Sequence, residues 1–131
     1  MKLRLHRNSV RLRLTQPDVR QLIVQGRVEE SVAFGAPAPT RLAYALEVSD
    51  DVRNVVCEFA DGRLVVRVPS ATAAAWARSE EVSIQSPESH GNGNNDTVPL
   101  KVLIEKDFRC LHGPASADES IDDYYPNPQT A

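Results

Sequence analysis

The chain has 131 residues, of which 41% are hydrophobic, and its formal net charge at pH 7 is −3. This length suits one domain with its own hydrophobic core, which needs no disulfide or metal to fold. Residues 1–6 alternate apolar and basic side chains and lack the apolar stretch of a secretory signal, and no later run approaches the ~20 apolar residues of a membrane span. The two cysteines, Cys57 and Cys110, form no paired-cysteine motif. We therefore expect a cytoplasmic protein that does not associate with membranes.

Positive charge is concentrated at the start of the chain. Residues 1–27 contain seven lysines or arginines and one acidic residue, a balance of 7 − 1 = +6, so the remainder carries −3 − 6 = −9. Such polarity has two interpretations: the two signs meet across the folded domain, or the basic segment binds nucleic acid or phosphate. One Trp, three Tyr and three Phe are few for a protein that stacks nucleic-acid bases.

The chain begins with a predicted hairpin and helix. Apolar residues alternate with charged ones over 3–5 and again over 10–14, the period of half-buried strands. Thr15 provides a helix N-cap, with Asp18 three residues later, and Gly26 is a suitable helix end. The spacing thus predicts two strands joined by a tight turn, then a helix.

The remaining elements follow the same logic. Asp61-Gly62, between two alternating runs, is the strongest hairpin signal in the sequence. An Ala-rich helix is expected after Pro69, and a polar loop over 86–97. The other predicted strands cover residues 28–34, 42–48, 55–59, 64–68, 82–84 and 100–104.

The two halves of the chain can be aligned with each other. An offset of 54 brings Leu3 onto Cys57 and Val28 onto Val82, and an offset of 58 brings Leu46 onto Ile104. The order of elements is strand–strand–helix–strand–strand in both halves. This agreement predicts an internal repeat, with copies at about 2–48 and 56–106.

The predicted fold class is α+β and mostly β. Internally duplicated ββαββ units form a single pseudo-two-fold barrel or two packed sheets, with two short helices. Double-psi and related cradle-loop barrels are similar in element order, a likeness that implies no function. Residues 1–112 form the domain, and residues 113–131 form an acidic, flexible tail. Within that tail, residues 121–126 resemble a docking peptide that folds back on the basic hairpin or binds another protein.

Five stretches carry a resemblance to known sequences: Ser9–Thr15, Gly26–Glu30, Leu42–Glu47, Glu105–Leu111 and Tyr125–Pro128. Together they resemble a family of short, uncharacterised bacterial proteins across nearly the whole chain. No activity is assigned to such proteins, so the resemblance implies no functional residues.

The first candidate site is a group of basic side chains on the predicted first hairpin. If its two strands pair, these side chains share one face, and their mutual repulsion favours an anionic partner. Guanidinium groups bind phosphate in a two-pronged way, although the acidic tail would serve equally well. The residues are Lys2, Arg4, Arg11 and Arg13.

The second candidate site consists of charged residues that occur once in each half. Two carboxylates near a two-fold axis could bind a cation or share a proton. The alternative is that each arginine pairs with a glutamate and orients the strands. The residues are Arg13, Arg67, Glu47 and Glu105.

No catalytic set is recognised, because the three histidines are scattered and no nucleophile or phosphate-loop motif occurs. Cys110 and His112 are too few for a zinc site, and Cys57 is expected in the core. We therefore expect no metal and no cofactor.

The favoured hypothesis is a non-catalytic interaction module acting through the basic hairpin, the tail or the cleft between repeats. Its partner is expected to be a protein, with RNA or a phosphate ligand as the alternative. A small enzyme or metal protein using Glu47 and Glu105, and a structural subunit of a homo-oligomer, remain as rivals.

Overall fold

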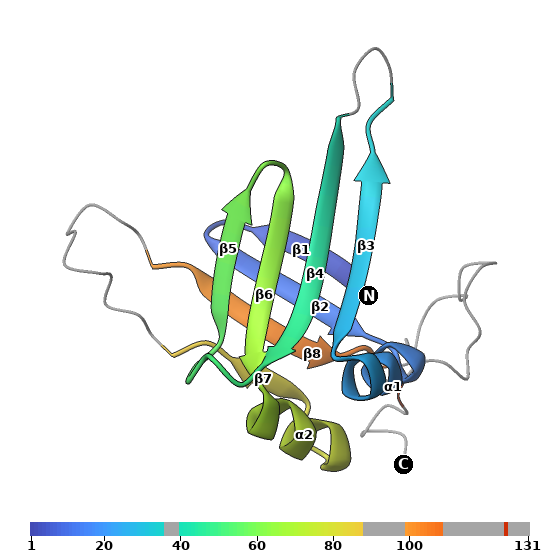
Figure 1. Cartoon of the computed structure of the whole chain (residues 1–131), viewed down its shortest axis with the longest axis vertical. Coiled ribbons are helices and arrows are strands. Elements are labelled where there is room, and N and C mark those ends of the chain that lie inside the picture. The colour runs from blue at the N-terminus through green and yellow to red at the C-terminus, as the bar shows by residue number, and fades with distance from the viewer. Residues whose placement is uncertain (36–39, 88–98, 109–124, 126–131) are drawn as a thin grey trace.

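The computed structural model describes residues 1–35, 40–87, 99–108 and 125. These residues form ten helices and strands, and Figure 1 shows their arrangement. In order they are β1 (Lys2–His6), β2 (Ser9–Leu14), α1 (Gln16–Gln25), β3 (Arg27–Ala33), β4 (Arg41–Ser49), β5 (Val56–Ala60), β6 (Arg63–Pro69), α2 (Ser70–Arg78), β7 (Ser83–Gln85) and β8 (Lys101–Lys106).

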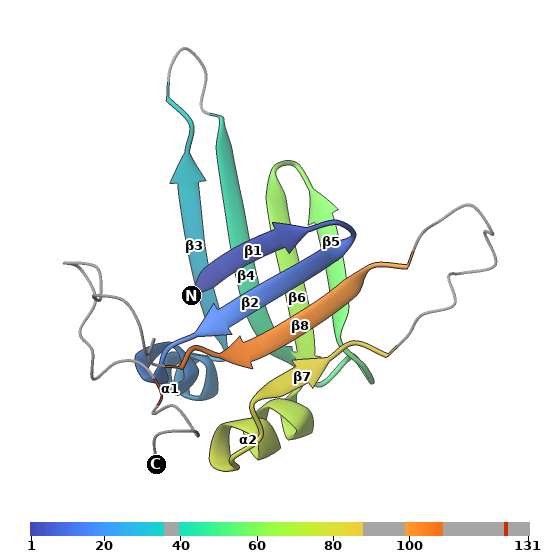
Figure 2. The same ribbon diagram turned by 180° about the vertical axis from the view of Figure 1, so that it is seen from behind.

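The strands form two four-stranded sheets that pack face to face. Sheet A has the order β1-β2-β8-β7, and sheet B has the order β3-β4-β6-β5. The central pairs β2–β8 and β4–β6 are parallel, and the outer pairs are antiparallel. Figure 2 shows sheet A running across sheet B. The prediction of two packed sheets is therefore confirmed and the barrel alternative is wrong, because no described strand of one sheet pairs with a strand of the other.

Each sheet combines the first hairpin of one half with the last hairpin of the other. Written from the other end, sheet B reads β5-β6-β4-β3, which matches β1-β2-β8-β7 element by element. The registers agree as well: Val10 pairs with Val102 in sheet A, and their counterparts Leu64 and Tyr44 pair in sheet B. That the halves are copies of one ancestral unit stays a prediction.

One detail of the sequence alignment is wrong. Val28 pairs with Leu46, and at the matching place in sheet A Ile84 pairs with Ile104. The counterpart of Val28 is therefore Ile84, at an offset of 84 − 28 = 56, and not Val82, which is 39% exposed. Residues 79–82 connect α2 to β7, whereas Gly26 alone connects α1 to β3, and this longer connection accompanies the larger offset.

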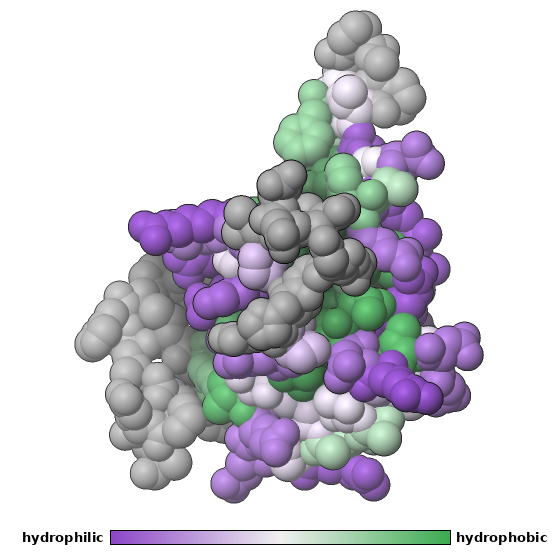
Figure 3. Space-filling view, turned by 90° about the vertical axis from the view of Figure 1, so that its left-hand side faces the viewer, coloured by the Kyte–Doolittle hydropathy of each residue, from purple (hydrophilic) through white to green (hydrophobic). Residues whose placement is uncertain are grey.

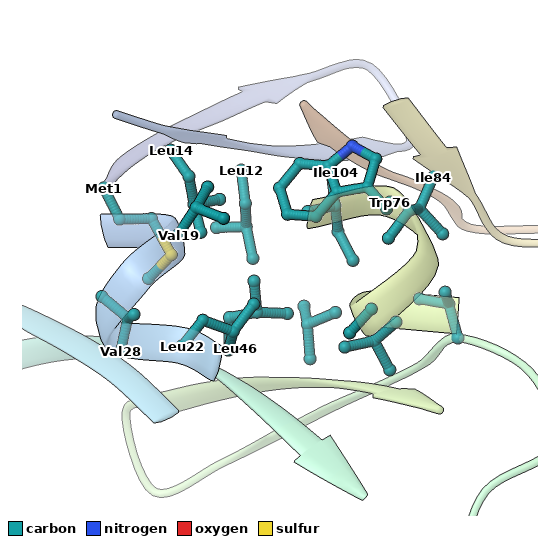
Figure 4. Close-up of a cluster of buried hydrophobic side chains, with 14 of the residues drawn as sticks. Met1, Leu12, Leu14, Val19, Leu22, Val28, Leu46, Trp76, Ile84 and Ile104 are labelled. Carbon is teal, nitrogen blue, oxygen red and sulfur yellow. The ribbon is translucent and has the colours of Figure 1, made fainter. Parts of the chain in front are cut away.

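The hydrophobic core fills the space between the sheets, and both helices close one end of it (Figures 1 and 4). Leu12, Leu46 and Ile104 are fully buried from the strands, because alternate residues of each strand face inward. Leu22 enters from α1 and Trp76 from α2, and both are also fully buried. The Trp76 Nε1 donates to the carbonyl of Val82 at 3.1 Å, so its polar atom is satisfied.

The predicted helix and turn signals are present. Thr15 and Asp18 form a reciprocal capping box at the start of α1, and Gly26 ends the helix with φ 77° while its N–H donates to Leu22. Asp61 and Gly62 connect β5 and β6 with φ 52° and 73°, the left-handed backbone of a tight hairpin turn.

The first residue is anchored in the domain. The α-amino nitrogen of Met1 lies 2.8 Å from Asp18 Oδ2 and 2.9 Å from Glu30 Oε2. The hydroxyl of Tyr44 donates to the Met1 carbonyl at 3.3 Å. Burial alone would lower the pKa of the α-amino group, but its hydrogen bonds to the two carboxylates outweigh burial and raise the pKa above its ordinary value of 8.0.

Candidate functional site

The predicted basic hairpin side chains share the outer face of sheet A. Their neighbours Leu12 and Leu14 point into the core, so Arg11 and Arg13 point outward. The antiparallel register places Lys2 opposite Arg13 and Arg4 opposite Arg11. The structure therefore brings this predicted set together.

The strand pairing arranges this outer face in three rows across sheet A. Row one is Lys2–Arg13–Glu105–Ser83, row two is Arg4–Arg11–Leu103–Gln85, and row three is His6–Ser9–Lys101. We call these rows the basic face. They hold five lysines or arginines and one carboxylate, a balance of 5 − 1 = +4.

Part of this charge is paired. The Nε of Arg11 lies 3.2 Å from Glu105, and the Nζ of Lys2 lies 3.4 Å from the buried Asp107. The Nε of Arg13 is buried and has no hydrogen-bond partner within the described part of the chain. No carboxylate of the described residues forms an ion pair with Arg4. The basic face thus keeps an excess of positive charge.

The matching face of sheet B is arranged differently. Its three rows are Val56–Arg67–Glu47–Arg27, Glu58–Val65–Ala45–Glu29 and Ala60–Arg63–Ala43–Ser31. We call these rows the balanced face, because three arginines and three glutamates give 3 − 3 = 0.

Every arginine of the balanced face has carboxylate partners. Arg67 lies 2.9 Å from Glu58 and 3.5 Å from Glu47, and the hydrogen bond to Glu58 raises the pKa of its guanidinium group. Arg63 lies 3.1 Å from Glu29 and 3.7 Å from Glu47. The third member, Arg27, contacts Glu29 and lies 3.5 Å from Glu47.

Equivalent positions of the two hairpins explain the contrast. At the offset of 54, Arg13 corresponds to Arg67, but Arg4 corresponds to Glu58. Arg67 therefore has a carboxylate beside it where Arg13 has another cation. Lys2 and Arg11 correspond to Val56 and Val65, which carry no charge. The two faces share one backbone pattern and differ in charge.

The second predicted set is only partly brought together. Glu47 lies on the outer face of sheet B beside Arg67, and Glu105 lies on the outer face of sheet A beside Arg13. The core separates the two outer faces, so the carboxylates of Glu47 and Glu105 do not converge on an axis. Within the predicted set, only Arg67 and Glu47 form an ion pair among the described residues, at 3.5 Å, whereas Glu105 pairs with Arg11 and not with Arg13.

A groove of about 650 Å³ opens over rows two and three of the basic face. Arg4, Arg11 and Lys101 contribute cations to it, Ser86 contributes a hydroxyl, and Leu103 contributes apolar surface. Lys101 and Ser86 are absent from the predicted set, because they join the hairpin only through the pairing of β2 with β8. The repeat gives no signal for Lys101, because its counterpart at the offset of 58 is the uncharged Ala43.

The remaining predicted features lie near the helices or outside the described residues. Tyr125, the one described residue of the predicted tail, donates its N–H to the Asp107 carbonyl at 2.9 Å, and burial raises the pKa of its hydroxyl. Its ring lies 5.5 Å from the Lys106 Nζ, which is also 5.4 Å from the Trp76 ring. This contact with the chain's own core is not the predicted contact with the basic hairpin. The connector over 36–39 and the rest of the tail lie outside the described residues, as do Cys110 and His112.

Two further findings concern metals and membranes. Cys57 is half-buried against the core, as expected, and burial together with Glu58 raises the pKa of its thiol. Among the described residues, no three His, Cys, Asp or Glu side chains are placed to hold a metal ion. Neither described helix has the length and apolar character needed to cross a bilayer.

Comparisons with known proteins place the chain in a family without giving it an activity. No curated protein and no solved structure matches it. A family model described as a family of unknown function (DUF7009) matches residues 1–129, in agreement with the resemblance to uncharacterised proteins. By this match over nearly its whole length, the chain belongs to that family of unknown function.

Proposed function

We propose that this chain is a non-catalytic binding module that holds an anionic partner on the basic face of sheet A. The observation that carries the proposal is the pairing of Arg4 with Arg11 directly across the hairpin. Like charges at opposed positions of a sheet destabilise the fold. The balanced face avoids this cost at the equivalent position with Glu58 and Val65. An anionic partner would offset the repulsion on the basic face.

The proposal is tested by removing charge from one face at a time. The variant Arg4→Gln with Arg11→Gln changes the basic face, and Arg63→Gln with Arg67→Gln is the matched control on the balanced face. Tagged full-length proteins are purified from the native host at low salt, and bound protein, nucleic acid and small molecules are identified by mass spectrometry. We expect the first variant to lose an anionic species that the wild type and the control retain. Equal losses from both variants, or none, would contradict the proposal.

Ionic strength provides a second arm of this test. The screening length falls from about 10 Å at 0.1 M salt to about 3 Å at 1 M. A partner held by the exposed charges of the basic face should therefore dissociate as salt is raised. Retention in 1 M salt would indicate an apolar contact instead.

A second proposal, a structural subunit of a homo-oligomer, is supported by apolar side chains at the ends of β3 and β5. Phe34 and Phe59 are 64% and 65% exposed. These strand ends lie away from the helices in Figure 1, and Figure 3 shows hydrophobic surface just below the tip of the β3–β4 hairpin. Sedimentation of the wild type and of Phe34→Ser with Phe59→Ser tests it. A wild type that remains monomeric at every concentration would remove this proposal.

A further inference from the structure

The groove on the basic face combines positive charge with an apolar wall. Its cations come from three different strands: Arg4 from β1, Arg11 from β2 and Lys101 from β8. Leu103 and the two prolines Pro87 and Pro99 supply apolar surface beside them. No carboxylate occurs among the described residues that line the groove. Its volume of about 650 Å³ falls within the range of roughly 300–1,000 Å³ found for small-molecule sites.

Several hydrogen-bond donors remain available to a ligand in this groove. The ion pair with Glu105 engages the Nε of Arg11 and leaves its two terminal nitrogens without a partner in the described chain. The Ser86 hydroxyl oxygen accepts from the Val102 N–H at 3.0 Å, so the hydroxyl proton can still be donated. Ser9, by contrast, already donates to the His6 carbonyl at 2.6 Å. Within the part of the chain that the structure describes, the donors left for a ligand are thus carried by Arg4, Arg11, Lys101 and Ser86.

The number and charge of these donors favour one chemical class. A phosphate monoester has three terminal oxygens and a charge of about −1.5 to −2 at neutral pH, whereas a carboxylate has two oxygens and a single charge. Guanidinium groups bind phosphate oxygens through paired hydrogen bonds. Among the described lining residues, His6 alone has an aromatic ring, which is little for stacking a nucleobase.

We infer that the groove binds a small organic phosphate monoester, with the phosphate between Arg4, Arg11 and Lys101 and the organic group against Leu103. The inference rests on the proposed anion-binding function of the basic face and names its ligand. It also divides that face: rows two and three contact the ligand, whereas row one, with Lys2 and Arg13, stays outside the groove.

The division makes the inference testable on the full-length protein by amide NMR titration. Phenyl phosphate, inorganic phosphate and phenol are the probes. We expect saturable shifts of the amides of residues 85, 86 and 100–103, with phenyl phosphate bound at least tenfold more tightly than either other probe. Phenyl phosphate bound no more tightly than inorganic phosphate would overturn the role of the apolar wall, and with it the inference.

Two groove variants and one control locate the site. Lys101→Ala and Ser86→Ala should each weaken phenyl phosphate binding at least fivefold, whereas Arg13→Gln, on the same face but outside the groove, should change it less than twofold. An unchanged amide spectrum away from the substitution shows that each variant is folded. An equal effect of Arg13→Gln and Lys101→Ala would overturn the assignment to the groove.

The outcome also separates this inference from the proposed function. If no probe binds while the Arg4→Gln, Arg11→Gln variant still loses its partner, the basic face acts without a phosphate site, and the inference is overturned. If phenyl phosphate binds in the groove while the double variant retains every partner in the pull-down, the groove is a phosphate site. The proposal that the basic face holds an anionic partner is then overturned.

Discussion

Arg4 lies directly opposite Arg11 across the β1–β2 hairpin. Replacing one member of this like-charged pair with an acidic residue turns repulsion into attraction. A cross-strand pair of opposite charges stabilises a sheet by about 0.2–1 kcal/mol. We therefore expect Arg4→Glu to raise the free energy of unfolding by about 0.5 kcal/mol in low salt. Urea denaturation followed by circular dichroism measures the change.

The matched control for this prediction is Glu58→Arg in sheet B. It breaks the 2.9 Å ion pair with Arg67 and places two arginines close together, so it should lower stability by a similar amount. Both effects should shrink in 0.5 M salt because the side chains are exposed. A wild type more stable than Arg4→Glu would argue against repulsion as a cost of the basic face.

The α-amino group of Met1 makes stability depend on alkaline pH. Its pKa is raised in the folded chain, so its contribution is complete below the ordinary value of 8.0 and is lost as pH rises through the folded value. For a chain that begins at Met1, we expect the free energy of unfolding to fall as the pH rises above 8. The double variant Asp18→Asn with Glu30→Gln should be less stable at pH 7 and should show a flatter dependence. If the free energy of unfolding depends on pH in the same way in the wild type and in the variant, the α-amino group of Met1 does not cause the loss of stability at alkaline pH.

The two turn glycines Gly62 and Gly35 should respond differently to substitution. Both have positive φ, 73° and 86°, so an alanine is strained at either position. A Cβ at Gly62 would lie 2.8 Å from the Arg41 carbonyl oxygen, whereas a Cβ at Gly35 meets no described atom within 4 Å. We expect Gly62→Ala to cost about 3 kcal/mol and Gly35→Ala about 1 kcal/mol. Thermal unfolding of both variants tests the difference. Equal losses of stability would indicate that backbone strain alone, and not the contact with Arg41, determines the cost of the alanine.

Trp76 holds helix α2 in the core. Its side chain is fully buried and its Nε1 donates to Val82, whose carbonyl also accepts from the Lys106 N–H at 3.0 Å. Trp76→Phe therefore leaves that carbonyl satisfied and should cost about 1–2 kcal/mol, mainly through lost contacts. Trp76→Ala opens a cavity and should cost about 3–5 kcal/mol. Chemical denaturation gives both values, and a nearly neutral Trp76→Ala would contradict this role.

Local signals in the sequence were sufficient for the elements. The capping box at Thr15 and the Asp61-Gly62 turn each depend only on residues a few positions apart in the sequence, so both can be predicted from short segments. Strand alternation also placed the basic side chains on one face of the first hairpin. These parts of the prediction did not need the tertiary structure.

The pairing of distant strands was beyond local patterns. Val82 and Ile84 are two residues apart and face the same side of an extended chain, so alternation could not decide between them; the pairing of Ile84 with Ile104 does. The same periodicity put Glu47 and Glu105 on outward faces without indicating that these belong to different sheets. Lys101 joined the candidate site for the same reason, through its register with Ser9.

The exchange of hairpins between the halves also constrains how the protein can be made. The segment 9–14 needs 101–106 as its parallel neighbour, so sheet A cannot be completed until residues 101–106 have left the ribosome. A break in the backbone between β4 and β5 would leave two fragments, each holding one hairpin of each sheet with its apolar side uncovered. Such fragments should stay unfolded when separate and assemble when mixed, because each supplies only part of the shared hydrophobic core.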